Sequence, residues 1–232
     1  MKAFLCSFLT FVVLGVAAVL TPAVVAQEQS VKPGINNSYK SPDAEKTARS
    51  YERENRDVVE NLDEIVSSCQ LEPGMEIADI GAGTGLFTRR FAAKVAPGGK
   101  VYAVDITKQF VEYIEKTCQQ QGIKNVVGVV NSETSAELPD GAVDRAFICD
   151  TYHHFEFPFK MLDSLRRAMR AGGRLIIVDY KKEKGVSPGW VFGHVRADKK
   201  TVIDEVTKAG FKFIDEVDLM KNQYVIRFEK PK

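Results

Sequence analysis

The chain has 232 residues, of which 44% are hydrophobic and 27% are charged. This composition supports a globular domain with its own hydrophobic core. Basic residues number 32 and acidic residues 31, which leaves a net charge of +1. Nucleic-acid-binding domains concentrate an excess of basic residues on one face, so this balance argues against a nucleic-acid partner.

The first 26 residues have the pattern of a leader. Met1–Lys2 is a short positive start, and residues 3–20 are almost wholly apolar. Pro22 and the short side chains that end at Ala26 fit cleavage by a signal peptidase after Ala26. The apolar run is also about long enough to span a bilayer. We therefore expect residues 1–26 to be a signal peptide that exports the protein to the periplasm or beyond, or an N-terminal membrane anchor. The third alternative is a mis-assigned start or an anchor with the domain facing inward.

The next two segments differ in character. Residues 27–40 are polar and rich in turn-forming residues, which predicts a linker. Ser41-Pro42-Asp43 predicts a helix start with Ser41 as N-cap, and apolar residues at helical spacing continue to about Cys69. The pairs Glu52/Arg56 and Arg53/Asp57 are spaced for ion pairs on that helix. Residues 41–71 are thus predicted to be helical, ahead of a domain at 72–232.

From Pro73-Gly74 strands and helices alternate. The predicted strands are Glu76–Ile80, Lys100–Asp105, Val126–Val130, Val143–Cys149 and Arg174–Tyr180, and the predicted helices are Leu86–Ala96, Gln109–Gln121 and Phe159–Ala171. Strands separated by helices form parallel sheets with right-handed crossovers. After a helix at Asp198–Ala209, strands Phe211–Asp218 and Gln223–Glu229 are joined by a short turn, so they must be antiparallel.

The most informative stretch is Asp79-Ile80-Gly81-Ala82-Gly83-Thr84-Gly85. It follows an apolar strand and leads into a helix, whose free N–H groups and positive dipole end face the loop. Glycine is needed where the backbone turns tightly and approaches a ligand closely. Asp105 ends the next strand, where a carboxylate can accept hydrogen bonds from two ribose hydroxyls.

The spacing and charge of this loop distinguish between cofactors. A dinucleotide loop has its third glycine one position later, where this chain has Leu86. Asp79 would repel a diphosphate, but it would attract a cofactor that carries an ammonium and a sulfonium group. The loop therefore favours S-adenosylmethionine over a nicotinamide dinucleotide.

Asp79–Gly85 resembles motif I of the class I S-adenosylmethionine-dependent methyltransferases, and the chain from about Glu72 to Glu229 is similar to that family in strand order. The resemblance implies a Rossmann-like, seven-stranded, mostly parallel α/β sheet with an antiparallel C-terminal strand and helices on both faces.

It also implies a cofactor site in which the glycine loop lies under the methionine part, Asp105 holds the ribose and Ile106 flanks the adenine. The adenine contact would come from Asn131, Ser132 or Glu133, where the family usually has an acid. The cofactor-binding set is Asp79, Gly81, Ala82, Gly83, Thr84, Gly85, Asp105, Ile106, Asn131, Ser132, Glu133 and Asp150. N-terminal helices commonly cover the cofactor in this family, which makes Tyr39, Tyr51, Arg53 and Arg56 candidates for a lid.

The fourth strand leads into Asp150-Thr151-Tyr152-His153-His154. Ligands of open α/β sheets bind outside the carboxyl ends of the strands, so these residues are expected beside the reacting methyl group. Asp150 is a candidate contact to the cofactor's amino group or to a cationic acceptor. His153 and His154 are candidate catalytic residues, because imidazole can take a proton near neutral pH. Tyr152, His194 and Arg196 are candidate substrate contacts.

The function predicted from these residues is methyl transfer from S-adenosylmethionine to a small-molecule acceptor, with S-adenosylhomocysteine as product. Asp150 and Asp179 together suggest a metal-assisted enzyme, but Tyr180 stands where the usual asparagine would follow. The remaining cysteines, Cys69, Cys118 and Cys149, show no Cys–His metal spacing. We therefore expect no metal. A nicotinamide-dependent oxidoreductase and a non-catalytic binder of S-adenosylmethionine are the alternatives, and the sequence assigns neither the acceptor nor an oligomeric state.

Overall fold

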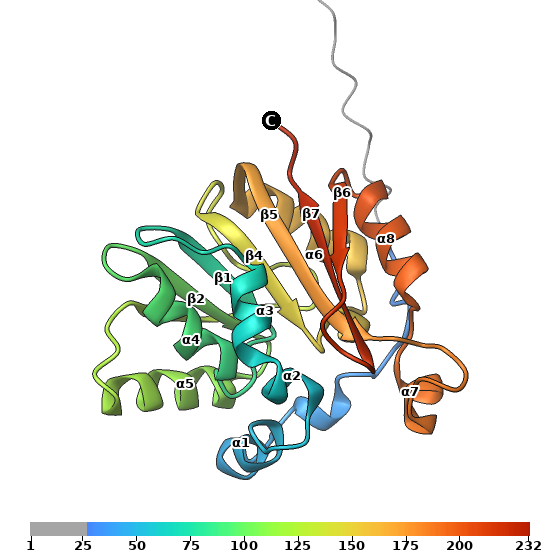
Figure 1. Cartoon of the computed structure of the whole chain (residues 1–232), viewed down its shortest axis with the longest axis horizontal. Coiled ribbons are helices and arrows are strands. Elements are labelled where there is room, and N and C mark those ends of the chain that lie inside the picture. Colours follow the sequence, from blue (N-terminus) through green and yellow to red (C-terminus); the bar gives the residue numbers. More distant parts are fainter. Residues whose placement is uncertain (1–26) are drawn as a thin grey trace, which may run out of the picture.

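A computed structural model describes residues 27–232, so the predicted leader lies outside the described residues. Its centre is a seven-stranded sheet in the order β3-β2-β1-β4-β5-β7-β6 (Figure 1). Neighbouring strands from β3 to β5 pair in parallel, and β7 pairs antiparallel with both β5 and β6. The predicted fold, including the reversed C-terminal strand, is confirmed.

The strand bounds agree closely with the prediction. The strands are β1 (Glu76–Ile80), β2 (Lys100–Asp105), β3 (Val126–Val130), β4 (Val143–Cys149), β5 (Met169–Tyr180), β6 (Lys212–Val217) and β7 (Gln223–Glu229). The main difference lies in β5, which begins at Met169 rather than at Arg174; β6 is one residue shorter at each end than predicted. Met169 pairs with Val143 and Arg174 with Arg145, so the register of β5 against β4 shifts between these pairs.

Helices pack on both faces of the sheet. The helical elements are η1 (Asn37–Tyr39), α1 (Ala44–Tyr51), α2 (Asp57–Glu60), α3 (Leu62–Ser68), α4 (Leu86–Val95), α5 (Lys108–Gln120), η2 (Tyr152–His154), α6 (Pro158–Ala168), α7 (Gly189–His194) and α8 (Lys199–Lys208). Apolar residues of α6 and α8 form one core with the sheet, and those of α3 and α4 form another. Within residues 27–232, no helix combines the length and apolar character that crossing a membrane requires.

The predicted single helix from Ser41 to about Cys69 is wrong. Asp43, rather than Ser41, is the N-cap of α1, and its carboxylate accepts a hydrogen bond from the Lys46 N–H. The chain leaves the helix after Tyr51, and Asn55 has a left-handed φ of 71°. The predicted ion pairs of this helix do not form. Glu52 binds Arg89 and Arg56 binds Asp150, so contacts with the domain replace the local ones.

The segment before α1, predicted as a linker, lies along the domain. The Val31 N–H donates to the Glu156 carbonyl at 2.9 Å. The Lys32 ammonium donates to the carbonyl of His194, and the Asn36 amide donates to that of His154. These hydrogen bonds place residues 31–36 next to η2 and α7, which follow β4 and β5 in the chain.

Candidate active site

A cavity of about 370 Å³ lies at the carboxyl ends of the parallel strands. Its floor is formed by the glycine loop after β1, by Asp105 and Ile106 after β2, and by Asp150 and Thr151 after β4. The N-terminal segment covers it, and the four lid candidates predicted from the sequence all line it: Tyr39, Tyr51, Arg53 and Arg56. The position is the one expected for the ligand site of an open α/β sheet.

The glycine loop is shaped by three left-handed residues, Gly81, Gly83 and Gly85, with φ values of 70°, 55° and 81°. Gly85 is also the N-cap of α4. The Gly81 N–H donates to the Val104 carbonyl at 2.8 Å, which holds the loop against β2. A Cβ on Gly81 would lie 2.3 Å from the Thr151 side chain, so no larger residue fits this turn.

Asp105 is buried and fixed by the backbone around it. Its Oδ2 accepts a hydrogen bond from the Gly83 N–H and its Oδ1 accepts one from the Thr107 N–H, both at 2.8 Å. Burial raises the pKa of Asp105, and these two hydrogen bonds oppose the rise. Ile106 follows with 37% of its surface exposed. A carboxylate that can accept hydrogen bonds from hydroxyl groups, next to an exposed apolar side chain, fits the ribose and base of a nucleoside.

Asp79 lies beneath the loop at the end of β1. The Thr88 hydroxyl donates to its Oδ2 at 2.6 Å. Burial raises the pKa of Asp79 to about 7, and the Thr88 hydrogen bond opposes this rise. A positively charged ligand in the cavity would favour the ionised form of this carboxyl group. The loop lies beside two buried acids, Asp79 and Asp105. It therefore suits a cationic adenosine derivative better than a diphosphate.

Asp150 lies between the lid and the end of the sheet. It has a left-handed φ of 49° and accepts hydrogen bonds from the Arg56 guanidinium at 2.9 Å and from the Gln223 amide. Burial raises the pKa of Asp150 to about 6, while Arg56 lowers it. The antiparallel pairing of Tyr180 with Gln223 brings the start of β7 to this point. The amide of Gln223 is a contact that the sequence analysis missed, and the register of the C-terminal hairpin is the signal that locates it.

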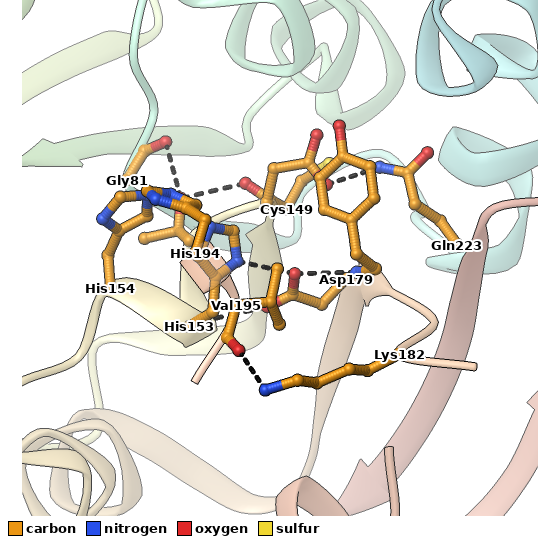
Figure 2. A network of polar contacts seen from close by, with 12 residues as sticks. Gly81, Cys149, His153, His154, Asp179, Lys182, His194, Val195 and Gln223 are labelled. Atoms are coloured by element: carbon orange, nitrogen blue, oxygen red, sulfur yellow. Dashed lines mark hydrogen bonds and ion pairs between the residues drawn. The ribbon is translucent and has the colours of Figure 1, made fainter. Parts of the chain in front are cut away.

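Three imidazole rings meet at the other end of the cavity (Figure 2). His153 Nδ1 lies 2.7 Å from Asp179 Oδ1, and the backbone N–H of His153 donates to Asp179 Oδ2. Asp179 raises the pKa of His153 against the effect of its burial, which lowers it. His154 Nε2 and His194 Nε2 are 3.4 Å apart. Burial and the neighbouring histidines lower the pKa of His154 to about 3.

The structure brings together most of the residues predicted for the site. The cofactor residues Asp79, Gly81, Ala82, Gly83, Thr84, Asp105, Ile106, Asn131, Ser132, Glu133 and Asp150 line one cavity, together with His153, His154 and His194. Gly85 caps α4 directly behind them.

Tyr152 and Arg196 are not brought to the cavity, which corrects their expected role as substrate contacts. The Tyr152 hydroxyl donates to Glu205 at 2.7 Å, and Arg196 binds both oxygens of the same carboxylate. Tyr152 is fully buried. The chain turns through η2 after β4, so Tyr152 points into the core next to α8 while His153 and His154 reach the cavity.

The strand order with a reversed β7, together with a glycine loop beside two buried acids, defines a class I S-adenosylmethionine-dependent methyltransferase fold. Comparison with protein families agrees with this class. The family described as "methyltransferase domain" matches residues 71–222, and the chain belongs to this family. Its cofactor is S-adenosylmethionine, and the loop, Asp105 and Ile106 fit that molecule.

Individual relatives are more distant. The chain is 25% identical over 126 residues to a ubiquinone/menaquinone biosynthesis C-methyltransferase of Bordetella avium, and the match covers 54% of this chain and 49% of the relative. It is 32% identical over 109 residues to a protein-L-isoaspartate O-methyltransferase of Aeropyrum pernix, with 46% and 39% covered. The chain thus spans half or less of the length of these curated relatives. Among solved structures, an S-adenosylmethionine-dependent methyltransferase from Aquifex aeolicus has a TM-score of 0.72 at 25% identity, covering 82% of this chain and all of that one.

Proposed function

We propose that this protein transfers the methyl group of S-adenosylmethionine to a small-molecule acceptor. The observation that carries the proposal is a single cavity that joins the glycine loop and Asp105 at one end to Asp150 and the histidines at the other. Bound S-adenosylmethionine supplies an electrophilic methyl group on a sulfonium centre. The protein's task is then to align the acceptor with that methyl group and to exclude water.

The chain's own residues divide this work. Asp105 accepts hydrogen bonds from the ribose hydroxyls, and Ile106 packs against the base near Asn131, Ser132 and Glu133. Asp79 and Asp150 supply negative charge for the ammonium and sulfonium groups. Tyr39, Tyr51 and Arg56 close over the cavity and keep water out of it. These assignments follow from the positions of the side chains around one cavity.

The acceptor end is lined by His153, His154, His194, Tyr180 and Trp190. Trp190 lies over Tyr180 with ring centroids 4.8 Å apart, and half of its surface is exposed. A small, flat acceptor with one polar group suits these walls, since aromatic side chains bury flat apolar surface and imidazoles can hold a polar atom. The names of the relatives include one C-methyltransferase and one O-methyltransferase, so the accepting atom is chosen by these walls and not by the fold.

A second role is open to His153. With a proton on Nδ1 held by Asp179, its other ring nitrogen can accept a proton from the acceptor's nucleophilic atom. A histidine oriented by a buried carboxylate is the arrangement that general bases use. Proton acceptance and direct binding of the acceptor's polar group differ in their pH dependence, because only the former stops when His153 is protonated.

The experiment starts with binding. The purified protein is titrated in a calorimeter with S-adenosylhomocysteine and, separately, with NAD. Affinity for S-adenosylhomocysteine and none for NAD supports the proposal, whereas the reverse supports the oxidoreductase alternative. A panel of small phenols, amines and thiols is then assayed for the release of S-adenosylhomocysteine. Tight cofactor binding with no turnover on any acceptor would favour the non-catalytic binder.

We also propose that residues 1–26 direct export. The support is the apolar run with its positive start and its small residues before Gln27. A possible exported protein from Bordetella parapertussis shares the fold, with a TM-score of 0.63 at 14% identity, a likeness that concerns the fold alone. A reporter that is active only outside the cytoplasm, fused after residue 27, should be active. An inactive reporter would place the domain in the cytoplasm.

A further inference from the structure

The chain contains three histidines, and all three meet at one point. His153 and His154 follow β4, whereas His194 ends α7, 40 residues further along the chain. One ring nitrogen from each lies within 4.8 Å of those of the other two. Figure 2 shows the three rings side by side. Histidine is the commonest metal ligand in proteins, and three imidazoles are a known ligand set of open zinc sites.

The spacing of two of the three donor atoms fits a tetrahedral ion, and the third lies within 4.8 Å of both. Zinc binds imidazole nitrogen at about 2.0–2.1 Å, which places two tetrahedral ligands about 3.3–3.4 Å apart. His154 Nε2 and His194 Nε2 are separated by 3.4 Å. Two neutral imidazoles can also form a hydrogen bond at this distance. The metal assignment therefore depends also on the third ring, His153, and on the carboxylate of Asp179.

Asp179 orients His153 as a carboxylate beside a metal site does. It binds Nδ1 at 2.7 Å and the backbone N–H of the same residue at 3.1 Å, and it also accepts from the Tyr180 N–H. Both groups are almost fully buried. With Nδ1 occupied, Nε2 is the free nitrogen of this ring. Metal-binding histidines usually donate their second N–H to a carboxylate, which fixes the ring and makes the other nitrogen a better ligand.

The charges around the cluster are mixed. Asp179 and Asp150 are negative, and the Lys32 ammonium lies close by, bound to the carbonyls of Gly193 and His194. His154 Nδ1 is buried and has no hydrogen-bond partner among the described residues.

We propose that His153, His154 and His194 form a binding site for one divalent transition-metal ion of the zinc type, with a fourth position open to the cavity. The site is new relative to the sequence analysis, which expected no metal because Tyr180 stands in place of the usual asparagine after Asp179 and the cysteines show no Cys–His metal spacing. In the context of the proposed function, this fourth position would hold the nucleophilic atom of the acceptor. Metal binding itself is independent of methyl transfer, and it can be measured without any cofactor.

The test uses the full chain after treatment with a chelator. Zn²⁺ is titrated against a chromophoric chelator at about pH 7.5. We expect one ion per chain. The matched variants are His194→Ala, which removes the ligand that ends α7, and Phe192→Ala, which removes an exposed side chain of the same short helix. His194→Ala should weaken Zn²⁺ binding by at least about 100-fold and Phe192→Ala should leave it unchanged. Asp179→Asn, which removes the carboxylate that orients the His153 ring, should weaken binding by about 10–100-fold.

Two further readouts make the outcome decisive. Co²⁺ in place of Zn²⁺ should give the visible absorption of a four-coordinate site, and His194→Ala should abolish it. S-adenosylhomocysteine binding is measured on the same samples, with circular dichroism as a check of folding. No Zn²⁺ binding by the folded protein, or equal binding by His194→Ala, would overturn the metal site. If the unaltered, folded protein bound Zn²⁺ but not S-adenosylhomocysteine, the metal site would stand and the proposed function would fail.

Discussion

Arg56 donates a hydrogen bond to Asp150 at 2.9 Å and thereby ties the N-terminal lid to the end of β4. The same arginine donates to the Tyr51 carbonyl, so it also holds the break between α1 and α2. Asn222 adds a second tie through its N–H, which donates to Asp57 at 2.9 Å. Polar contacts therefore fix the lid to the carboxyl ends of the sheet strands. A bound ligand can replace these contacts with contacts of its own.

Arg56→Met should loosen the lid with little loss of global stability. Both partners of the ion pair keep part of their surface in water, 21% for Arg56 and 16% for Asp150, so the pair contributes about 1 kcal/mol or less. We expect limited proteolysis between residues 52 and 56 to become several-fold faster, while the melting temperature changes by a few degrees at most. Arg49→Met on the exposed side of α1 is the control. Equal cleavage rates in both variants would show that Arg56 does not hold the lid.

Gly81→Ala should destabilise the protein more than Gly122→Ala. The two glycines have nearly the same left-handed φ, 70° and 72°, so the backbone cost of about 1–2 kcal/mol is shared. Only at Gly81 would the new Cβ meet another side chain, Thr151 at 2.3 Å, whereas nothing lies within 4 Å at Gly122. Overpacking adds about 1–3 kcal/mol. Thermal unfolding measures the difference, and similar melting temperatures for the two variants would refute the close approach of loop and β4.

Asp105→Ala should lower the affinity for S-adenosylhomocysteine by about 100-fold. Hydrogen bonds to a charged group contribute about 1.5–3 kcal/mol each, and this carboxylate also positions the Gly83 N–H of the loop. Glu112→Ala on the neighbouring helix α5 removes an exposed acid and should leave the affinity unchanged. Calorimetric titration compares the three proteins. Unchanged affinity in Asp105→Ala would remove the ribose contact on which the cofactor assignment rests.

The sequence predicted the sheet well because local pattern and topology agree there. Apolar runs bounded by helices or turns predict β1 to β4 to the residue, and the short turn before Gln223 requires an antiparallel partner. The glycine loop and Asp105 were found for the same reason, since neighbouring strand ends must lie side by side.

Contacts between segments far apart in the chain were not predictable in this way. Glu52 and Arg56 have ideal helical spacing, yet Arg89 and Asp150 bind them instead. His194 was a separate candidate because nothing in the sequence shows that α7 folds back onto His153 and His154. Tyr152 directly precedes the two cavity histidines in the sequence, but the turn η2 directs its side chain into the core. Its position in the sequence alone therefore led to a wrong prediction of a substrate contact.

Asp79 should make cofactor binding depend on pH. Its pKa is about 7 in the folded protein, against 3.8 for an ordinary aspartate, because burial outweighs the Thr88 hydrogen bond; Asp105 adds to the rise and Arg89 opposes it. The folded state thus binds this proton more tightly than the unfolded chain does. Its contribution to stability is complete below about pH 4 and is lost as the pH rises through about 7. Asp79→Asn should therefore flatten the fall in stability of the ligand-free protein between about pH 5 and 8.

The same carboxyl group should release a proton when S-adenosylmethionine binds, because a cationic ligand lowers its pKa below 7. Affinity should then rise as the pH is raised from about 6 to 8. S-adenosylhomocysteine has no sulfonium charge, so it should release fewer protons and show the weaker pH dependence. Calorimetry in buffers of different ionisation enthalpy measures the protons released, and Asp79→Asn should abolish the difference between the two ligands. Equal proton release for both ligands in the unaltered protein would show that Asp79 does not respond to the sulfonium charge.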